Sequence, residues 1–581
     1  MQGIPPYIRF FGVRETDLMA SPKGPEKTKI SFWDLVRKAS EKSVRRRPGF
    51  TSAWVEDVSR DEPRDSRENV YAKIEIHSNS GGSERCYALT PAEFGLDHHS
   101  LEKIKESIAN LELEPPPSSV MDDETRLRRY VERRVMRELK KNRSGKNPIN
   151  DQVLSRICGQ YTIGLGVLEH LLRDERVQDV YVDPPLSTNP VHLTIGGMTD
   201  PELEGSYPTN VILTEEEVRR IVSILRYTSG RPFSEANPVL ECDMPVFNSR
   251  VTAVSPPLSP GGISLAIRKH SHDPWTLLRL ISSGSLTPRA AAFLDLCIDG
   301  RSTMLIAGPR GAGKSSLLGA LLFNVDPSTR IITIEDTPEL PVKHLTEEGF
   351  NVLGLTVEGD GKQSTDKALR TALRLGESVL VMGEVRGPET RTLYEAMSAG
   401  TAGSAVLGTF HGDSAESVYK RTVEDLGVSP GSFSSTDLVI VCGLVQPKGR
   451  RTRYRRVVQV SEYIKKGKPG RFRDLFCFDS DTGSLLMDDD ISSSETFSRI
   501  ASIWGMNRRE LFSELDVRTK VLEQARDTLD ESEMEKPSSM VKVLNALRDA
   551  REELALEKGP DSDLIGKWKV KMSWEGEAWE I

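Results

Sequence analysis

The sequence lacks the features that mark membrane-spanning, secreted and zinc-binding proteins. No apolar run approaches the roughly 18 residues that a bilayer-spanning helix needs. The first residues lack the basic-then-apolar layout of a secretory signal. The six cysteines are scattered singly with no C-x-x-C pair, so neither a disulfide framework nor a zinc site is indicated. These absences favour a soluble protein of the cytoplasm.

The chain also lacks the excess of basic residues that is typical of nucleic-acid-binding proteins. Its formal net charge is -8, so any contact with nucleic acid would have to come from local patches, and no stable nucleic-acid partner is expected. With 581 residues the chain is too long for one hydrophobic core, and we expect several domains.

One stretch, residues 304–322, carries the clearest chemical signal. An apolar strand pattern leads into the motif G-x-x-x-x-G-K-S, and an apolar helix pattern follows. Glycines allow successive backbone N–H groups to turn toward phosphate oxygens at a helix N-terminus. Lys314 would reach the β- and γ-phosphates of ATP, and Ser315 would offer its hydroxyl to Mg²⁺. The predicted nucleotide-binding residues are Gly308, Pro309, Arg310, Gly311, Ala312, Gly313, Lys314, Ser315 and Ser316.

Three further segments place polar side chains directly after apolar patterns. The strand pattern at 331–334 ends in the acidic run EDTPE, the one at 379–382 runs into Gly383 and Glu384, and a third precedes His411. Ligands bind at the carboxyl ends of strands in parallel α/β sheets, so these side chains are aimed at the phosphates. Each segment alone could be a helix cap or a hydrogen-bonded structural histidine. Their order and spacing behind the phosphate loop favour one nucleotide site.

The rest of the chain gives weaker signals. Strand patterns at 70–78 and 85–91 suggest a hairpin, helix patterns cover 31–40 and 100–113, and a basic helix covers 123–141. The cations of this last helix are Arg126, Arg128, Arg129, Arg133, Arg134, Arg137, Lys140 and Lys141. Because the helix also has an apolar stripe, we interpret them mainly as a solvated face, with nucleic-acid or acidic-lipid binding as the minority alternative.

A second basic segment, 448–456, is predicted to lie at the turn of a late hairpin. We interpret it as a solvated hairpin tip rather than a grip on DNA.

Composition and periodicity divide the chain into five predicted segments. Strand and helix patterns alternate up to about residue 445, which implies a mainly parallel sheet covered on both faces. The segments are a flexible arm (1–65), an N-terminal accessory domain (66–148), a second N-terminal α/β domain (149–272), an ATPase domain (273–460) and a mostly helical extension (461–581).

Together these segments resemble the secretion-type ATPase superfamily that powers type II secretion, type IV pili, archaella and type IV secretion. They are most similar to its archaeal pilus-assembly and archaellum motor ATPases. The strings that carry the resemblance are GLGVLEHLLRDERVQDVYVDPP, RPFSEANPVLECDMPVFNSRVTAV, IEDTPEL, GEVRGPET and AMSAGTAGSAVLGTFHGDSAESVYKR. The resemblance implies an α/β fold with a RecA-like P-loop ATPase domain, preceded by a smaller α/β N-terminal domain and flanked by mixed N- and C-terminal extensions.

The resemblance also implies roles for the acidic residues and the histidine. Glu339 is expected to orient and deprotonate the attacking water. Glu384 is expected to organise Mg²⁺ or its water shell, since Gly383 occupies the position where an aspartate usually ends the Walker B strand. The predicted metal-site residues are therefore Ser315 and Glu384. His411 resembles the histidine that senses the state of the nucleotide.

Arginines complete the implied catalytic set. Arg250 and Arg268 resemble the arginines that the N-terminal domain brings to the phosphates, where they would neutralise developing charge, an effect that can be worth roughly 10³–10⁵ in rate. Which of the two faces the γ-phosphate, and whether it acts within one chain or across a subunit boundary, stays open at this point. Arg386 could act similarly or form an internal salt bridge.

The implied function is that of a hexameric, Mg²⁺-dependent ATPase that drives assembly of a type IV pilus-like filament or protein secretion across the cytoplasmic membrane. Its expected cofactors are ATP and Mg²⁺. Its expected partners are other copies of the chain, in a homo-hexamer, and a polytopic platform protein at the inner face of the cytoplasmic membrane. The alternatives are an archaellum motor, an ATP-binding scaffold with vestigial turnover, and a DNA-translocating RecA-like ATPase, which the net charge disfavours.

Overall fold

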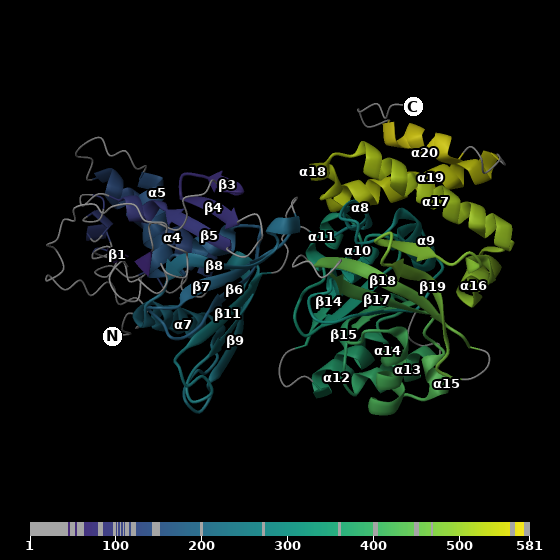
Figure 1. The fold of residues 1–581 in the computed structure, drawn as a ribbon, viewed down its shortest axis with the longest axis horizontal. Coiled ribbons are helices and arrows are strands. Elements are labelled where there is room, and N and C mark those ends of the chain that lie inside the picture. Colours follow the sequence, from purple (N-terminus) through teal and green to yellow (C-terminus); the bar gives the residue numbers. More distant parts are fainter. Residues whose placement is uncertain are drawn as a thin grey trace. The chain divides into compact units, whose positions relative to one another are not determined.

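The computed structural model forms two compact units, unit 1 (Met1–His272) and unit 2 (Asp273–Ile581) (Figure 1). It describes residues 63–78, 85–96, 124–141, 151–197, 201–269, 274–357, 362–398, 405–446, 453–465, 469–557 and 564–573, together with 45–46, 53–54 and isolated positions between 100 and 117. The predicted helix at 31–40, most of the predicted arm, much of the helix at 100–113 and the basic turn at 447–452 lie outside the described residues.

Unit 1 is built on an 11-stranded, mostly antiparallel sheet. Its central path runs in the order β3-β4-β5-β8-β7-β6-β11-β10-β9. The strands are β1 (Arg45–Arg46), β2 (Ala53–Trp54), β3 (Asp65–Glu68), β4 (Ala72–Ser78), β5 (Arg85–Pro91), β6 (Val177–Val182), β7 (Pro190–Ile195), β8 (Gly205–Ile212), β9 (Val239–Met244), β10 (Ser249–Val254) and β11 (Ser264–Lys269). The α-helices are α4 (Glu124–Lys141), α5 (Asp151–Thr162), α6 (Leu168–Arg173) and α7 (Glu215–Ser229).

The sheet of unit 1 crosses the boundary that the sequence predicts at 148/149. Strand β5 pairs with β8 in parallel, and the Asn210 side chain bonds both the N–H and the carbonyl of Leu89, at 2.8 and 3.0 Å. The buried side chains of the two segments also form one hydrophobic cluster. The accessory segment and the second α/β segment therefore share one core, and the finer division stays a prediction.

Helix α4 has the two faces that its sequence pattern predicts. Its apolar stripe is buried against α5 and neighbouring residues. The opposite face exposes basic residues three or four positions apart, namely Arg126, Arg129, Arg133, Arg137 and Lys140. Arg128 is the exception to the predicted solvated face, because it is buried and its guanidinium donates to both carboxylate oxygens of Glu169.

Lys269 of unit 1 is a partly buried lysine with a hydrogen-bond partner. It ends β11, and its Nζ donates to the carbonyl oxygen of Asp174 at 2.6 Å. Burial lowers the pKa of Lys269 from 10.5 to about 8, against the opposing attraction of Asp174 and Glu175.

This pKa predicts a pH-dependent stability. Between about pH 8 and 10.5 the unfolded chain binds more protons at Lys269 than the folded chain, so the free energy of unfolding should rise with pH. From about pH 7 to pH 9 we expect a rise of about 1 kcal/mol that is absent in Lys269→Met, as measured by denaturant unfolding. Parallel pH curves for the two proteins would contradict this.

Unit 2 contains a 9-stranded sheet in the order β14-β13-β15-β16-β12-β17-β18-β19-β20. The first six strands in this order are parallel and the last three are antiparallel. The strands are β12 (Met304–Ala307), β13 (Ile331–Glu335), β14 (Val352–Thr356), β15 (Val379–Val385), β16 (Ala405–Phe410), β17 (Leu438–Val445), β18 (Tyr454–Tyr463), β19 (Phe472–Asp479) and β20 (Ser484–Met487). This arrangement confirms the predicted α/β fold with a mainly parallel sheet.

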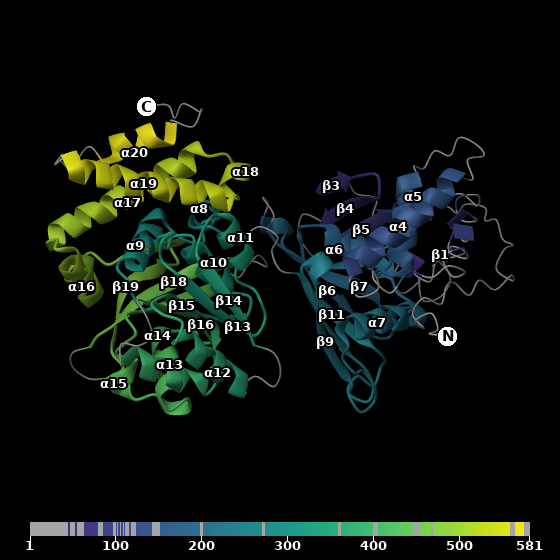
Figure 2. The same ribbon diagram turned by 180° about the vertical axis from the view of Figure 1, so that it is seen from behind.

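Helices cover both faces of this sheet, each over its own hydrophobic cluster (Figure 2). Those packed on one face include α8 (Leu277–Ser282), α9 (Pro288–Asp299), α10 (Lys314–Leu322) and α11 (Val342–Glu347). Those on the other include α12 (Lys362–Ala372), α13 (Glu389–Ser398), α14 (Ala415–Lys420) and α15 (Pro430–Phe433). Strand β18 spans the boundary predicted at 460/461, so that division also stays a prediction.

The C-terminal helices form a further layer against α8 and α9 (Figure 1). They are α16 (Glu495–Trp504), α17 (Arg508–Thr528), α18 (Glu531–Met534), α19 (Pro537–Glu557) and α20 (Leu564–Ser573). Helix α17 begins with a capping box in which Asn507 and Glu510 satisfy each other's backbone N–H groups.

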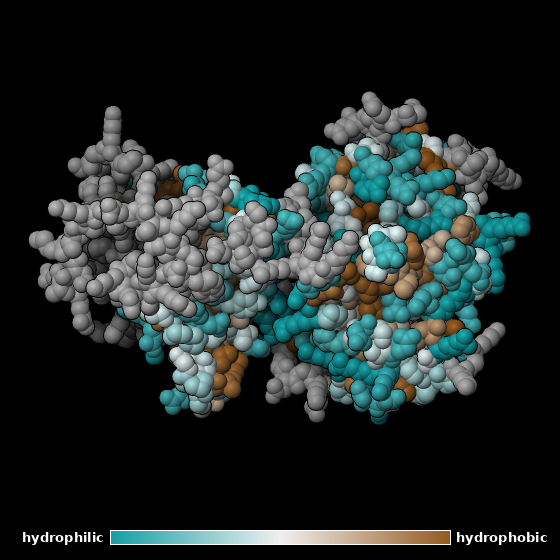
Figure 3. All heavy atoms as spheres, viewed as in Figure 1, coloured by the Kyte–Doolittle hydropathy of each residue, from teal (hydrophilic) through white to brown (hydrophobic). Residues whose placement is uncertain are grey.

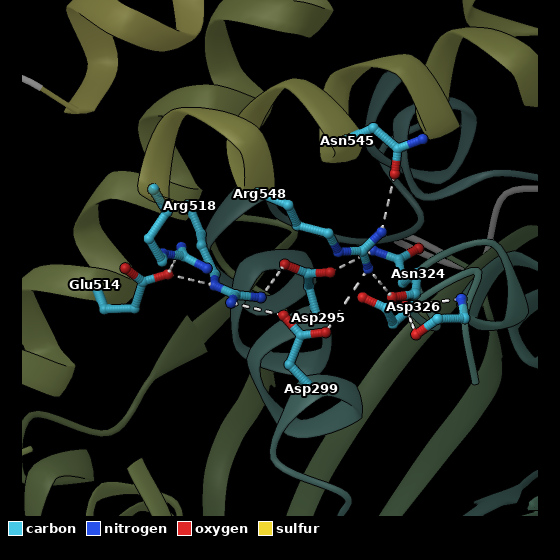
Figure 4. Close-up of polar contacts among 10 residues, drawn as sticks. Asp295, Asp299, Asn324, Asp326, Glu514, Arg518, Asn545 and Arg548 are labelled. Atoms are coloured by element: carbon cyan, nitrogen blue, oxygen red, sulfur yellow. Dashed lines mark hydrogen bonds and ion pairs between the residues drawn. The ribbon is translucent and has the colours of Figure 1, made fainter. Parts of the chain in front are cut away.

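Charged contacts join this layer to the helices that cover the sheet of unit 2 (Figure 4). The Arg518 side chain on α17 is 2% exposed and contacts Asp295 and Asp299 of α9 as well as Glu514. Arg548 on α19 donates to the carbonyl oxygen of Asn324, two residues beyond α10, at 2.7 Å. The layer is therefore held by buried ion pairs as well as by apolar packing.

On the face drawn in Figure 3, hydrophobic residues of unit 2 lie in small groups among hydrophilic ones. Among the described residues, no helix is both long and apolar enough to cross a membrane.

Candidate functional site

The phosphate loop connects β12 to α10 with backbone geometry that requires glycine. Gly311 and Gly313 have φ of +79° and +92°, and Gly313 is the residue that precedes α10. At Gly308, φ is +152° and a Cβ atom would lie 2.4 Å from the carbonyl oxygen of Cys442 on β17. Because β12 is entirely buried between β16 and β17, the loop is anchored in the centre of the sheet. The N-terminus of α10 thus has the form of a phosphate cradle.

Lys314 and Ser315 begin α10, and the structure joins both to neighbouring groups. The Lys314 Nζ donates to the Pro309 carbonyl oxygen at 3.1 Å, across the loop. Burial lowers the pKa of Lys314, and the nearby carboxylates of Glu384 and Glu339 oppose this shift. The Ser315 hydroxyl donates to Glu339 Oε2 at 2.6 Å. The predicted Mg²⁺-binding hydroxyl and the predicted catalytic carboxylate are therefore in direct contact.

Glu335 supports the loop that carries Glu339. It is the last residue of β13 and is only 6% exposed. Its Oε1 accepts hydrogen bonds from the backbone N–H groups of Glu339 and Leu340, at 2.9 and 3.0 Å. Burial, with the nearby carboxylates of Glu339 and Asp336, raises the pKa of Glu335 to about 7, although the two hydrogen bonds oppose the shift.

Glu384 lies near the end of β15 and contacts two side chains, His411 and Arg386. Its Oε1 is 2.8 Å from His411 Nε2, and its Oε2 is 3.2 Å from the Arg386 guanidinium. Arg386 also contacts Asp336 at 2.5 Å. The pairing of β15 with β16 is irregular between Met382 and Val385, and such irregularities commonly re-aim side chains near active sites. The structure thus links Glu384 to His411 and makes Arg386 part of an internal ion pair.

A small cavity of about 20 Å³ lies at this end of the sheet, with room for roughly one water molecule. Three of the acidic residues already described line it together with Arg386. The full lining is Ile334, Glu335, Asp336, Thr365, Glu384, Arg386 and Glu389. The described residues contain no cluster of three or more His, Cys, Asp or Glu side chains that could hold a metal by themselves.

The two predicted arginine fingers are neighbours in unit 1. Arg250 on β10 lies opposite Arg268 on β11 in the antiparallel pairing. Arg250 contacts Glu241 at 3.2 Å and Arg268 contacts Asp179 at 2.9 Å, and both side chains are partly exposed. Their role at the phosphates stays a prediction.

Sequence reasoning missed two residues at the site. Arg455, in the segment interpreted as a solvated hairpin tip, donates from Nε to the Gly311 carbonyl oxygen at 3.0 Å. One signal could have placed Arg455 near the site. Its strand, β18, pairs with β17, which in turn pairs with the P-loop strand β12. Glu335 was visible only as part of an acidic run, and nothing in its spacing distinguished its supporting contacts from those of Glu339.

Comparison with known proteins identifies the family. Residues 220–475 match the family described as Type II/IV secretion system protein. A putative conjugal transfer protein of Mycobacterium tuberculosis is 32% identical over 274 residues, which is 46% of this chain and 74% of that protein. The chain belongs to the type II/IV secretion system protein family. The matched residues of this secretion-family protein include the P-loop described above.

Two further similarities accompany this assignment. An uncharacterized protein of Methanocaldococcus jannaschii is 30% identical to this secretion-family protein over 377 residues, which is 63% of this chain and 66% of that protein. The chain thus spans just under two thirds of that relative's length. The solved structure of the Legionella pneumophila ATPase DotB is 17% identical, with a TM-score of 0.40, over 61% of this chain and 86% of that chain.

Proposed function

We propose that this secretion-family protein is a hexameric, Mg²⁺-dependent ATPase that couples ATP hydrolysis to assembly of a type IV pilus-like filament or to protein secretion across the cytoplasmic membrane. The observation that carries the enzymatic part is the direct contact between Ser315 and Glu339, beside the Glu384–His411 pair. It brings a hydroxyl of the P-loop helix, a candidate base and a candidate Mg²⁺-organising carboxylate to one edge of the sheet.

Each residue has a defined task in this proposal. The P-loop N–H groups and Lys314 bind the phosphates, while Ser315 and, through water, Glu384 would hold Mg²⁺. When bound, Mg²⁺ neutralises charge on the phosphates. Glu339 accepts a proton from the attacking water, and His411, bonded to Glu384, responds to the state of the nucleotide.

Arg250 and Arg268 are proposed to complete the site from unit 1. Each side chain is partly exposed and forms an ion pair with a carboxylate near the surface, and surface ion pairs of this kind contribute little to stability. We propose that they approach the γ-phosphate as ATP-driven motion brings unit 1 toward unit 2, either within one chain or between neighbouring subunits of the hexamer.

The proposed partners are a polytopic platform protein and the inner face of the cytoplasmic membrane. The exposed basic face of α4 supports a peripheral position, because anionic lipid headgroups attract such residues by about 1 kcal/mol each. An archaellum motor is the second candidate, since the resemblance to archaeal motors applies to it equally. A DNA-translocating ATPase is a less supported third candidate.

The ring mechanism predicts a concentration-dependent rate. We expect the ATPase rate per subunit to rise as hexamers appear in mass photometry, and Arg268→Ala to lower it by about 10³-fold. Arg219→Ala is the matched control, because Arg219 is an exposed arginine of unit 1 that pairs with Glu215 on the same helix. The ring mechanism would be wrong if the protein stayed monomeric, its rate per subunit did not depend on concentration, and Arg268→Ala left that rate unchanged. The protein would then be a P-loop ATPase that acts without forming a ring.

A further inference from the structure

Two features around Glu335 go beyond the proposed roles of the site. The first is that Glu335 contacts the backbone of Glu339 rather than its side chain. The two hydrogen bonds from Glu339 and Leu340 end on a single buried oxygen of Glu335, at 2.9 and 3.0 Å. They fix where the chain leaves β13. The direction from which the Glu339 side chain reaches Ser315 depends on that exit.

The second feature is the absence of a side chain at position 383. A Cβ atom there would lie 2.9 Å from Glu335 Cγ, closer than real Cβ contacts, and 3.4 Å from Glu335 Cβ. The Gly383 backbone has little freedom to retreat, because its carbonyl oxygen accepts a hydrogen bond from the Thr409 hydroxyl on β16. Its φ lies outside the left-handed range that favours glycine, so space rather than backbone conformation excludes a side chain there.

We infer that Glu335 is a positioning residue for hydrolysis, and that position 383 is glycine because the Glu335 side chain occupies the space where a side chain would stand. Glu335 holds the Glu339 backbone so that the Glu339 carboxylate meets the Ser315 hydroxyl. An aspartate at position 383 would displace Glu335. This inference rests on the proposed role of Glu339 as the base.

The experiment compares Glu335→Gln, Glu335→Ala, Gly383→Ala and the double variant Glu335→Ala/Gly383→Ala, by ATPase kinetics and by affinity for a fluorescent ATP analogue. A glutamine oxygen can accept the same two N–H groups, so Glu335→Gln should keep kcat within about threefold of wild type. Glu335→Ala should lower kcat by about 10²-fold with KM and nucleotide affinity nearly unchanged, as expected for a misplaced catalytic group.

Gly383→Ala tests the spatial coupling. It should lower kcat in the wild-type background but cause little further loss with Glu335→Ala, since the atom that its Cβ would meet is then gone. Gly354→Ala is the matched control, because this glycine lies on β14 of the same sheet and the nearest contact of an added Cβ would be an ordinary 3.4 Å. If Glu335→Ala does not fold, Glu335→Gln and Gly383→Ala, checked by their melting temperatures, decide the question.

The outcomes separate this inference from the proposed function. Wild-type kcat in Glu335→Ala or Gly383→Ala would overturn the positioning role, provided that Glu339→Gln remains inactive. A loss of kcat in Glu335→Gln as large as that in Glu335→Ala would also overturn the positioning role. In that case the negative charge of Glu335, and not its hydrogen bonds to the Glu339 and Leu340 backbone, would determine the rate. Equal activity of wild type and Glu339→Gln would instead refute the proposed role of Glu339 as the base, on which this inference rests.

Discussion

Replacing Glu339 by glutamine should lower kcat for ATP hydrolysis by about 10²–10⁴-fold while leaving ATP affinity nearly unchanged. Glutamine keeps the length of the side chain and can still accept the Ser315 hydroxyl, which lies 2.6 Å from Glu339 Oε2. It cannot accept a proton from water. The phosphate loop and Lys314 are untouched, so binding should survive. Steady-state ATPase assays together with titration of a fluorescent ATP analogue measure the two effects separately.

The matched control for this experiment is Glu377→Gln. Glu377 is an exposed carboxylate of the same unit that pairs with Arg301 at 3.0 Å, on the surface. Its replacement should leave both kcat and affinity within about a factor of two, since surface ion pairs contribute little. Retention of kcat in Glu339→Gln would remove Glu339 from the role of base and direct attention to Glu384.

Replacing Arg518 by methionine should lower the free energy of unfolding of unit 2 by about 3–5 kcal/mol. Methionine fills much of the same volume but leaves Asp295, Asp299 and Glu514 without the guanidinium that all three contact (Figure 4). Asp295 is fully buried, and burial raises its pKa while the charge of Arg518 opposes that shift. Denaturant unfolding followed by circular dichroism measures the loss.

Arg526→Met on the same helix provides the comparison. Arg526 forms an ion pair with its neighbour Asp527, and both side chains are substantially exposed. We expect a change of less than about 0.5 kcal/mol. If Arg518→Met were as stable as Arg526→Met, the buried cluster would not hold the C-terminal layer to the core.

Local sequence patterns predicted the elements well where one periodicity dominated. The patterns at 70–78 and 85–91 predicted β4 and β5, and the apolar stripe at 123–141 predicted the buried face of α4. Arg128 was missed because its partner Glu169 lies 41 residues away on α6, and no pattern within α4 distinguishes a paired arginine from a solvated one. A buried ion pair depends on which elements the fold brings together.

At the candidate site, too, local motifs were predictable and contacts that depend on the fold were not. The P-loop residues were predictable because their glycines and Lys314 form a motif that is local in the chain. The contact of Glu339 with Ser315 was foreseen only as convergence at one sheet edge, since strand order cannot be read from spacing. Glu335 bonds backbone N–H groups four and five residues ahead, and Arg455 bonds the carbonyl oxygen of the distant Gly311. The spacing of the acidic run does not distinguish the first contact, and no local motif encodes the second.

The bond from Arg548 to the end of the P-loop helix has a thermodynamic consequence. Arg548 of helix α19 donates a hydrogen bond to the carbonyl oxygen of Asn324, and Arg518 of α17 forms an ion pair with Asp295 of α9. Any ligand that binds the C-terminal helices differently in the ATP-bound and nucleotide-free states must also change the affinity for ATP, and by the same factor. The helical layer would then be an allosteric input to the P-loop, through which a load on the protein could set how tightly ATP is bound.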